Sequence, residues 1–228
     1  MSTTVTAATT TCPRAAERRR VWPIVLGAGY SLTWIVGLSI WPTNLSVRSS
    51  GAQILAAFAG HRAVAAVQYL LTEGLPALGL LAMAGLLAGL TRRRVSAGRA
   101  RSVFAAGALA GLISLVQTGI GLVLSLSAAP AGQVSTAHTL FEALNRLDGA
   151  KMLLIAAFAL AAGPLFRRGE LPRWLGYAAI VLAASIAVSG IGYLLLIPGP
   201  AQAAWVSLPA LLVWITGSAT AIGRSTGR

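Results

Sequence analysis

Three polar side chains lie deep inside long apolar runs of the sequence. Glu73, Gln117 and Lys151 belong to the second, third and fourth of six such runs. At 1.5 Å per helical residue, they lie about 26, 21 and 22 Å from the arginine-flanked ends of their helices. Groups at one level on three helices of a bundle can meet. Because ionisable groups at this depth in a membrane usually pair or serve a function, these residues are the leading candidates for chemistry.

The segment around Glu73 carries further polar and helix-breaking residues. Tyr69, Glu73 and Pro76 share one helical face, with Gln68 and Thr72 beside them. A proline inside a helix removes the hydrogen bond to the carbonyl four residues earlier, which here belongs to Thr72. A kink, a carbonyl and a carboxylate are therefore predicted at one place. Irregular backbone at membrane depth is tolerated where it lines a cavity or is buried in protein.

These groups admit three interpretations. In the first, they form a polar pocket that holds a ligand head group or relays a proton. In the second, Glu73 and Lys151 form a structural ion pair. In the third, both side chains extend to water near the membrane surface. Asp148, three residues before Lys151, competes with Glu73 for the ammonium. Catalytic residues are not assigned. The candidates for a ligand site or polar pocket are Glu73, Lys151, Gln117, Tyr69, Gln68 and Thr72, with helix kinks at Pro76 and Pro209.

A metal site is a weak alternative. His138 and Glu142 are four residues apart, and His61 lies on another connection. Zinc sites use three or four ligands at recognisable spacing, so no metal is expected from these three residues. No other cofactor is expected either, since the sequence contains no Walker loop, dinucleotide fingerprint or haem-attachment motif.

Six apolar runs must position these groups. Hydrophobic residues make up 56% of the 228 residues and charged residues 10%, and the mean hydropathy is +0.76. Because soluble domains carry about 25% charged residues and about 20 helical residues cross a bilayer, we predict an all-α integral membrane protein. The predicted domain covers 21–223, between a disordered cytoplasmic tail at 1–20 and a short tail at 224–228. The predicted spans are 22–41, 63–90, 103–126, 147–166, 174–197 and 203–222.

The arginine clusters predict the orientation of the chain. They occupy both tails and the second and fourth connections, whereas the opposite side holds Arg48, Arg62, Arg146 and Lys151. Basic connections stay in the cytoplasm, so both termini are predicted to be cytoplasmic. The net charge of +13 therefore reflects membrane insertion, and no nucleic acid is expected as a partner. The arginine-, alanine- and glycine-rich composition is typical of a GC-rich bacterial genome. The predicted location is therefore the cell membrane of a bacterium, that is, its inner membrane.

A short amphipathic helix is predicted in the outer connection before the fourth span. Thr139 and Glu142 have the spacing of a capping box, and Leu140, Leu144 and Leu147 form one apolar stripe at helical spacing. The segment is expected to lie at the outer surface and to run into the fourth span.

The entrance to the fifth run carries the motif Leu171-Pro172-Arg173-Trp174-Leu175. It resembles the corresponding entrance in an uncharacterised family of bacterial six-span membrane proteins, known only as a domain of unknown function. The resemblance implies a six-span fold over about 21–222 and supplies no activity. The motif also makes physical sense, because a proline begins a helix well and Trp174 suits the headgroup level.

Three classes of function remain. The first is a protein that binds or transports a small molecule, including a lipophilic one, in an outward-open polar pocket around Glu73. The second is a membrane-embedded enzyme acting on a lipid or isoprenoid-like substrate, and the third is an accessory or immunity-type protein without activity. A cavity that reaches Glu73 favours the first two classes, and a second acid lining that cavity favours the enzyme. The expected partners are the lipid bilayer and a small-molecule ligand, and the oligomeric state is left open.

Overall fold

The computed structural model describes residues 13–41, 43 and 45–225, and every regular element in this part of the chain is helical. Six long segments are apolar enough to cross a membrane, so the chain is a multi-pass membrane protein, as predicted. They are α1 (Pro13–Ile40), α3 with η1 and α4 (Arg62–Tyr69, Leu70–Gly74, Leu75–Arg94), α5 with η2 (Ala97–Val123, Leu124–Ala128), α6 with α7 (Val134–Ala161, Gly163–Arg167), α8 (Arg173–Leu195) and α10 (Ala204–Ser225). The short helices α2 (Gly51–Phe58) and α9 (Pro198–Ala201) lie in connections.

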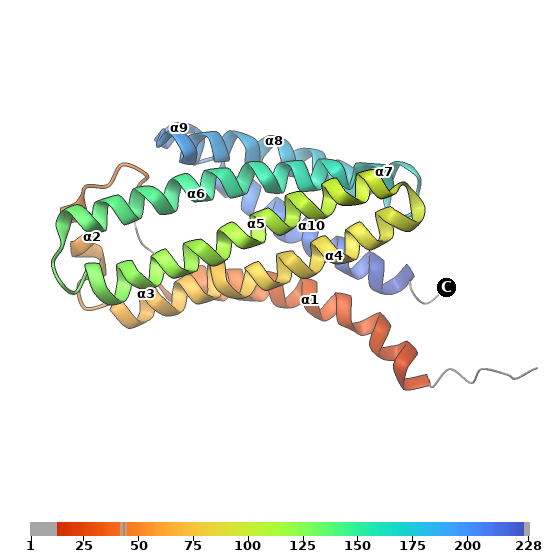
Figure 1. The fold of residues 1–228 in the computed structure, drawn as a ribbon, viewed down its shortest axis with the longest axis horizontal. Coiled ribbons are helices and arrows are strands. Elements are labelled where there is room, and N and C mark those ends of the chain that lie inside the picture. The colour runs from red at the N-terminus through yellow and green to blue at the C-terminus, as the bar shows by residue number, and fades with distance from the viewer. Residues whose placement is uncertain (1–12, 42, 44, 226–228) are drawn as a thin grey trace, which may run out of the picture.

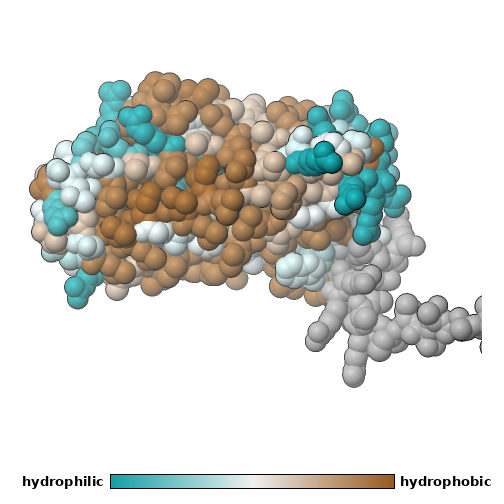
Figure 2. Space-filling view, in the orientation of Figure 1, coloured by the Kyte–Doolittle hydropathy of each residue, from teal (hydrophilic) through white to brown (hydrophobic). Residues whose placement is uncertain are grey.

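The surface of the bundle matches a bilayer. Figure 2 shows a broad apolar belt between two hydrophilic ends. Large apolar side chains are exposed along the helices, among them Leu78, Leu112 and Val181. Helices satisfy their own backbone hydrogen bonds in lipid, so an exposed apolar belt on helices implies contact with the bilayer.

The six spans form a closed ring. Each span packs against the next in the chain, and α10 returns to pack against α1. The seam between α1 and α10 is close because Gly27 lies against Ala219, and the hydroxyls of Ser31 and Thr216 are 2.7 Å apart. The start of α1 and the end of α10 lie at the same end of the bundle (Figure 1), which we call the arginine-rich end.

The segments that flank the predicted spans extend several helices. The amphipathic helix expected before the fourth span is the first part of α6, which continues without a break into that span. Of the predicted N-terminal tail, 1–12 lies outside the described residues, and 13–20 begin α1. Of the predicted C-terminal tail, 226–228 also lies outside them. Pro172 directly precedes α8, in agreement with its predicted role as a helix start.

A π-helical turn replaces the simple kink expected at Pro76. The turn η1 contains Glu73, and the Leu75 amide donates to the Leu70 carbonyl five residues earlier. Pro76 follows as the second residue of α4. A single wide turn of this kind accommodates a residue that cannot donate to a regular helix, and such turns are frequent at functional sites. Pro209 lies inside α10, which is continuous across it.

The half of the bundle nearer the arginine-rich end has a packed apolar centre. Phe158 of α6 and Trp214 of α10 are fully buried, and their rings meet edge to face with centroids 5.4 Å apart. Met83 of α4 is buried in the same cluster. These three side chains are called the apolar floor below.

Candidate functional site

A buried lysine holds two carboxylates together. The Lys151 ammonium donates to Glu73 Oε1 at 2.8 Å and Oε2 at 2.7 Å, and it lies 2.6 Å from Asp148 Oδ1. Lys151 and Glu73 are 4% and 8% exposed, so neither side chain extends to water. The ion pair across the second and fourth spans, one of the three interpretations of the sequence, is present. The predicted competition with Asp148 is wrong, because one ammonium has three donors and reaches both acids.

Ser114 and Gln117 of α5 each donate a hydrogen bond to one of the two carboxylates. The Ser114 hydroxyl donates to Glu73 Oε2. The Gln117 amide donates to the Leu144 carbonyl at 3.1 Å and to Asp148 Oδ1 at 3.5 Å. The three helices that carry Glu73, Gln117 and Lys151 therefore meet at one level, as the residue count along each span predicts. Glu73, Asp148, Lys151 and Ser114 are called the charged cluster.

A glycine pair fixes α6 beside α8 at the same level. An added Cβ at Gly149 would lie 2.5 Å from the Gly190 carbonyl oxygen and 2.5 Å from the Leu194 nitrogen. Only a residue without a side chain permits this approach, which is typical of helix packing in membranes. Because Gly149 lies between Asp148 and Lys151, the approach also sets where both charged side chains begin.

A cavity of about 630 Å³ lies next to the charged cluster. Asp148, Lys151 and Ser114 line it, whereas Glu73 lies behind them, bonded to two of the three. Thr43 and residues 45–47 of the connection after α1, together with the short helix α9, also line the cavity. Both follow helix ends remote from the arginine-rich end, so the cavity is in the opposite half of the bundle.

The cavity ends above the apolar floor. Leu80, Ile155 and Leu211 line it and are about 3% exposed. Each lies one turn before a floor residue along its own helix, since Met83, Phe158 and Trp214 follow three residues later. Space for a ligand on one side is therefore separated from the arginine-rich end by packed apolar side chains.

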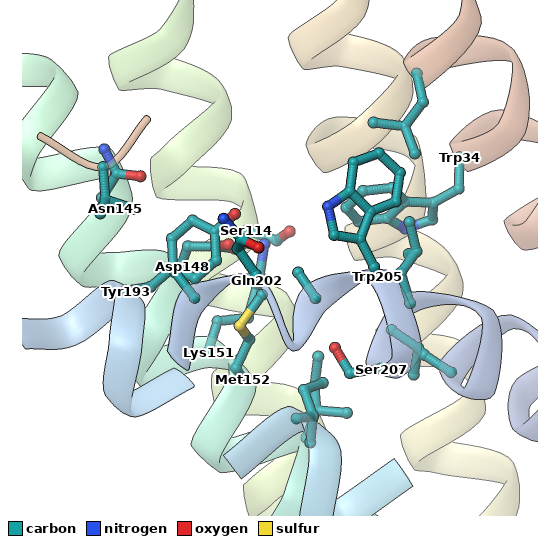
Figure 3. A pocket seen from close by; sticks show the side chains of 18 of the residues that line it. Trp34, Ser114, Asn145, Asp148, Lys151, Met152, Tyr193, Gln202, Trp205 and Ser207 are labelled. Atoms are coloured by element: carbon teal, nitrogen blue, oxygen red, sulfur yellow. Dashed lines mark ion pairs between the residues drawn. The ribbon is translucent and has the colours of Figure 1, made fainter. Parts of the chain in front are cut away.

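Aromatic side chains form much of the cavity wall. Tyr30, Trp34, Trp41, Tyr193 and Trp205 all line it. In Figure 3 Asp148, Lys151 and Ser114 gather on one side of the cavity, whereas Trp34 and Trp205 lie on the other. The Lys151 nitrogen is 6.0 Å from the centre of the Trp34 ring. The arrangement suits a molecule with a polar group at one end and an apolar body.

The remaining predicted pocket residues divide into two groups. Gln68 and Pro76 line the cavity, and the Gln68 amide donates to the carbonyls of Gly37 and Trp41. Tyr69 and Thr72 do not line it.

Other packing accounts for the residues outside the cavity. The Tyr69 ring packs closely on Gly121, and the Thr72 hydroxyl donates to the Gln68 carbonyl at 2.9 Å. Pro209 is likewise not among the lining residues.

The weak metal candidates do not form a ligand set. Within the described parts of the chain, no group of three or more His, Cys, Asp or Glu side chains is placed to hold a metal ion. His61 Nδ1 lies 2.8 Å from the Ala59 carbonyl oxygen, and its ring stacks on Trp41. His138 and Glu142 both lie on α6.

The aromatic wall is the part of the site that sequence reasoning missed. Trp41 is the last residue of the first apolar run, Trp34 lies seven residues before it, and Trp205 lies at the start of the sixth run. Tryptophan near the ends of spans is ordinary in membrane proteins, so its position alone did not distinguish a cavity wall from an interfacial anchor. The available signal was the presence of three tryptophans in the halves of the spans remote from the arginines, with Trp34 about two turns inside the first run.

Comparison of the chain with protein-family models, curated proteins and solved structures finds no match. The family resemblance of the Leu-Pro-Arg-Trp-Leu motif is therefore not confirmed by a family model, although six membrane-spanning helices agree with the fold that it implies.

Proposed function

We propose that this protein binds a small amphiphilic molecule in the cavity beside the charged cluster. The observation that carries the proposal is a cavity of about 630 Å³ with charged groups on one side and the rings of Trp34 and Trp205 on the other. Ligand sites have volumes of about 300–1,000 Å³, mostly apolar walls and a few placed polar groups. The cavity fits each of these properties.

Two residues of the cavity wall are also exposed on the surface of the bundle. Leu38 and Trp205 line it, and they are 43% and 84% exposed. Both lie at span ends remote from the arginine-rich end. A lipophilic ligand that partitions into the bilayer thus meets exposed wall residues before it reaches the polar side.

The proposal includes an orientation and a membrane. With the arginine-rich end in the cytoplasm, as the positive-inside rule favours, the cavity opens away from the cytoplasm in the cell membrane of a bacterium. Membership of the six-span family indicated by the motif at the start of α8 is part of the same proposal, and it adds no activity. Binding is the step that this conformation supports. Transport requires Phe158 and Trp214 to separate.

Membrane-embedded catalysis is the second candidate, because Asp148 supplies the second acid that it needs. Asp148 lines the cavity, and its side chain is 20% exposed. Both oxygens of Glu73, by contrast, accept hydrogen bonds from Lys151. One accessible carboxylate can act as an acid or base, whereas paired acid and base catalysis needs a second free group. Binding is therefore favoured.

Two substitutions at neighbouring positions test the proposal. Ser207 of α10 is 1% exposed and lines the cavity, whereas Val206 is 57% exposed and does not line it. Ser207→Phe fills space inside the cavity, and Val206→Phe adds the same ring to the outer surface. Binding of three aromatic probes to the purified protein in nanodiscs is measured: tetraphenylphosphonium, tetraphenylborate and uncharged triphenylphosphine oxide.

The expected result is saturable binding of at least one probe by the natural protein and by Val206→Phe. Ser207→Phe is expected to lower that affinity at least tenfold. The proposal is overturned if none of the three probes binds, or if both variants bind as the natural protein does.

A further inference from the structure

We infer that the ligand is a monovalent organic cation whose charge lies against Asp148. The inference rests on the proposed function, because it specifies the chemical class of the molecule that the cavity holds. It follows from the count of charges and hydrogen-bond donors beside the cavity.

With both acids ionised, the charged cluster carries one more negative charge than positive. Two carboxylates, Glu73 and Asp148, share the single ammonium of Lys151. Among the described residues that line the cavity, Asp148 and Lys151 are the ones with a formal charge at neutral pH. An uncompensated charge in a membrane interior is costly. A ligand with one positive charge makes the cluster and ligand neutral together.

The lysine has no donor left for an anionic ligand. An ammonium has three N–H groups, and three carboxylate oxygens lie within 2.8 Å of the Lys151 nitrogen: Glu73 Oε1, Glu73 Oε2 and Asp148 Oδ1. A carboxylate or phosphate that entered the cavity would find this cation already bonded and an excess of negative charge beside it.

Asp148 keeps one acceptor for a ligand. Its contacts with Lys151 and Gln117 both use Oδ1, and Oδ2 accepts no hydrogen bond from the described residues. The Asp148 side chain is 20% exposed and faces the cavity. The Glu73 side chain, which is behind it, is 10% exposed and uses both oxygens. Asp148 is therefore the carboxylate that a ligand meets.

The opposite wall suits the same ligand class. The faces of tryptophan and tyrosine rings have a negative electrostatic potential that attracts cations, and such rings recognise quaternary ammonium groups. Trp34 already lies within 6.0 Å of one cation, Lys151. Trp205 lies on the same side of the cavity as Trp34 (Figure 3). A cation with an apolar body matches the carboxylate and the rings at once.

The charge of the probe and the charge of Asp148 are varied together in the test. Tetraphenylphosphonium and tetraphenylborate have the same shape and opposite charge, and triphenylphosphine oxide is a neutral reference. Affinities in nanodiscs of uncharged lipid are measured for the natural protein, Asp148→Asn and Asp148→Glu. Glu142→Gln is the matched control, since Glu142 also lies on α6 and does not line the cavity.

The natural protein is expected to bind the phosphonium at least tenfold more tightly than either other probe. Asp148→Asn is expected to remove that preference while it leaves the affinity for the neutral probe within about twofold. Asp148→Glu and Glu142→Gln are expected to retain the preference. If Asp148→Asn fails to fold, the probe preference of the natural protein and of Asp148→Glu decides the outcome.

Failure of the cation assignment differs from failure of the proposed function. If the neutral or anionic probe binds as tightly as the phosphonium or more tightly, and Ser207→Phe still blocks that binding, the assignment of a cation is overturned. The cavity then remains a binding site. An unchanged preference in a folded Asp148→Asn variant overturns the role of Asp148. Absence of binding by all three probes overturns both proposals.

Discussion

Replacement of Lys151 by methionine is expected to be the most damaging change in the charged cluster. It leaves Glu73 and Asp148 without their shared cation, and Glu73 is only 8% exposed. Removal of one partner from a buried ion pair costs about 3–5 kcal/mol. Because two carboxylates lose their partner here, we expect a loss of about 4–5 kcal/mol in the free energy of unfolding.

Removal of either acid is expected to cost less. Glu73→Gln leaves Lys151 paired with Asp148 at 2.6 Å, and Asp148→Asn leaves it paired with both oxygens of Glu73. Each variant keeps one carboxylate for one ammonium. The loss is then that of a charge-assisted hydrogen bond, about 1.5–3 kcal/mol.

Thermal unfolding in a single detergent, followed by tryptophan fluorescence, checks this order. At about 2–4 °C per kcal/mol for a chain of this size, Lys151→Met is expected to lower Tm by roughly 10–15 °C and Glu73→Gln by roughly 4–8 °C. The double variant Glu73→Gln/Lys151→Met is expected to lose at least about 1 kcal/mol less in free energy of unfolding than the sum of the two single losses. A Lys151→Met loss no larger than that of Glu73→Gln, or strictly additive losses, would refute the reasoning.

Two further predictions concern topology and helix packing. In a cysteine-free background, an impermeant thiol reagent added to intact cells is expected to label a cysteine that replaces Gln133 and not one that replaces Ser96. Labelling of the cysteine at position 96 alone would show that the orientation is the reverse of the predicted one. Gly149→Ala is expected to lower Tm because its Cβ would lie 2.5 Å from two backbone atoms of α8, at a cost of about 1–3 kcal/mol. Gly85→Ala is the control, since nothing lies within 4 Å of its added Cβ, and an equal loss in both variants would contradict the packing argument.

Counting along the helices predicted which residues meet. Glu73, Gln117 and Lys151 come together because helical rise is constant and the spans that carry them are consecutive neighbours in the ring. The same regularity, through the number of helical residues that cross a bilayer, predicted the six spans, whereas the role of Pro172 followed from the preference of proline for the start of a helix. These results depend on the chain's local geometry, which the sequence specifies directly.

The cavity could not be predicted in this way. Its wall combines Trp34 of α1, Tyr193 of α8 and Trp205 of α10, so it depends on which spans close the ring and how each is rotated. The sharing of one ammonium by two acids was not predicted, because the contact of Asp148 with Lys151 was treated as an alternative to that of Glu73. The π-helical turn before Pro76 depends on a shift of one residue in hydrogen-bond partners, which apolar periodicity does not reveal.

The separation of the charged cluster along the chain has a consequence for biosynthesis. Glu73 and its cation are 78 residues apart, so at about 5–20 residues per second the ribosome delivers Lys151 roughly 4–16 seconds after Glu73. During that interval no basic residue lies between 63 and 91 in the second span, and Ser114 on the third span is the first of the carboxylate's final hydrogen-bond partners to be made. An acid without its cation is costly in lipid, which favours retention of the second span beside the insertion machinery until the fourth span emerges. The ring itself closes last, when α10 reaches α1.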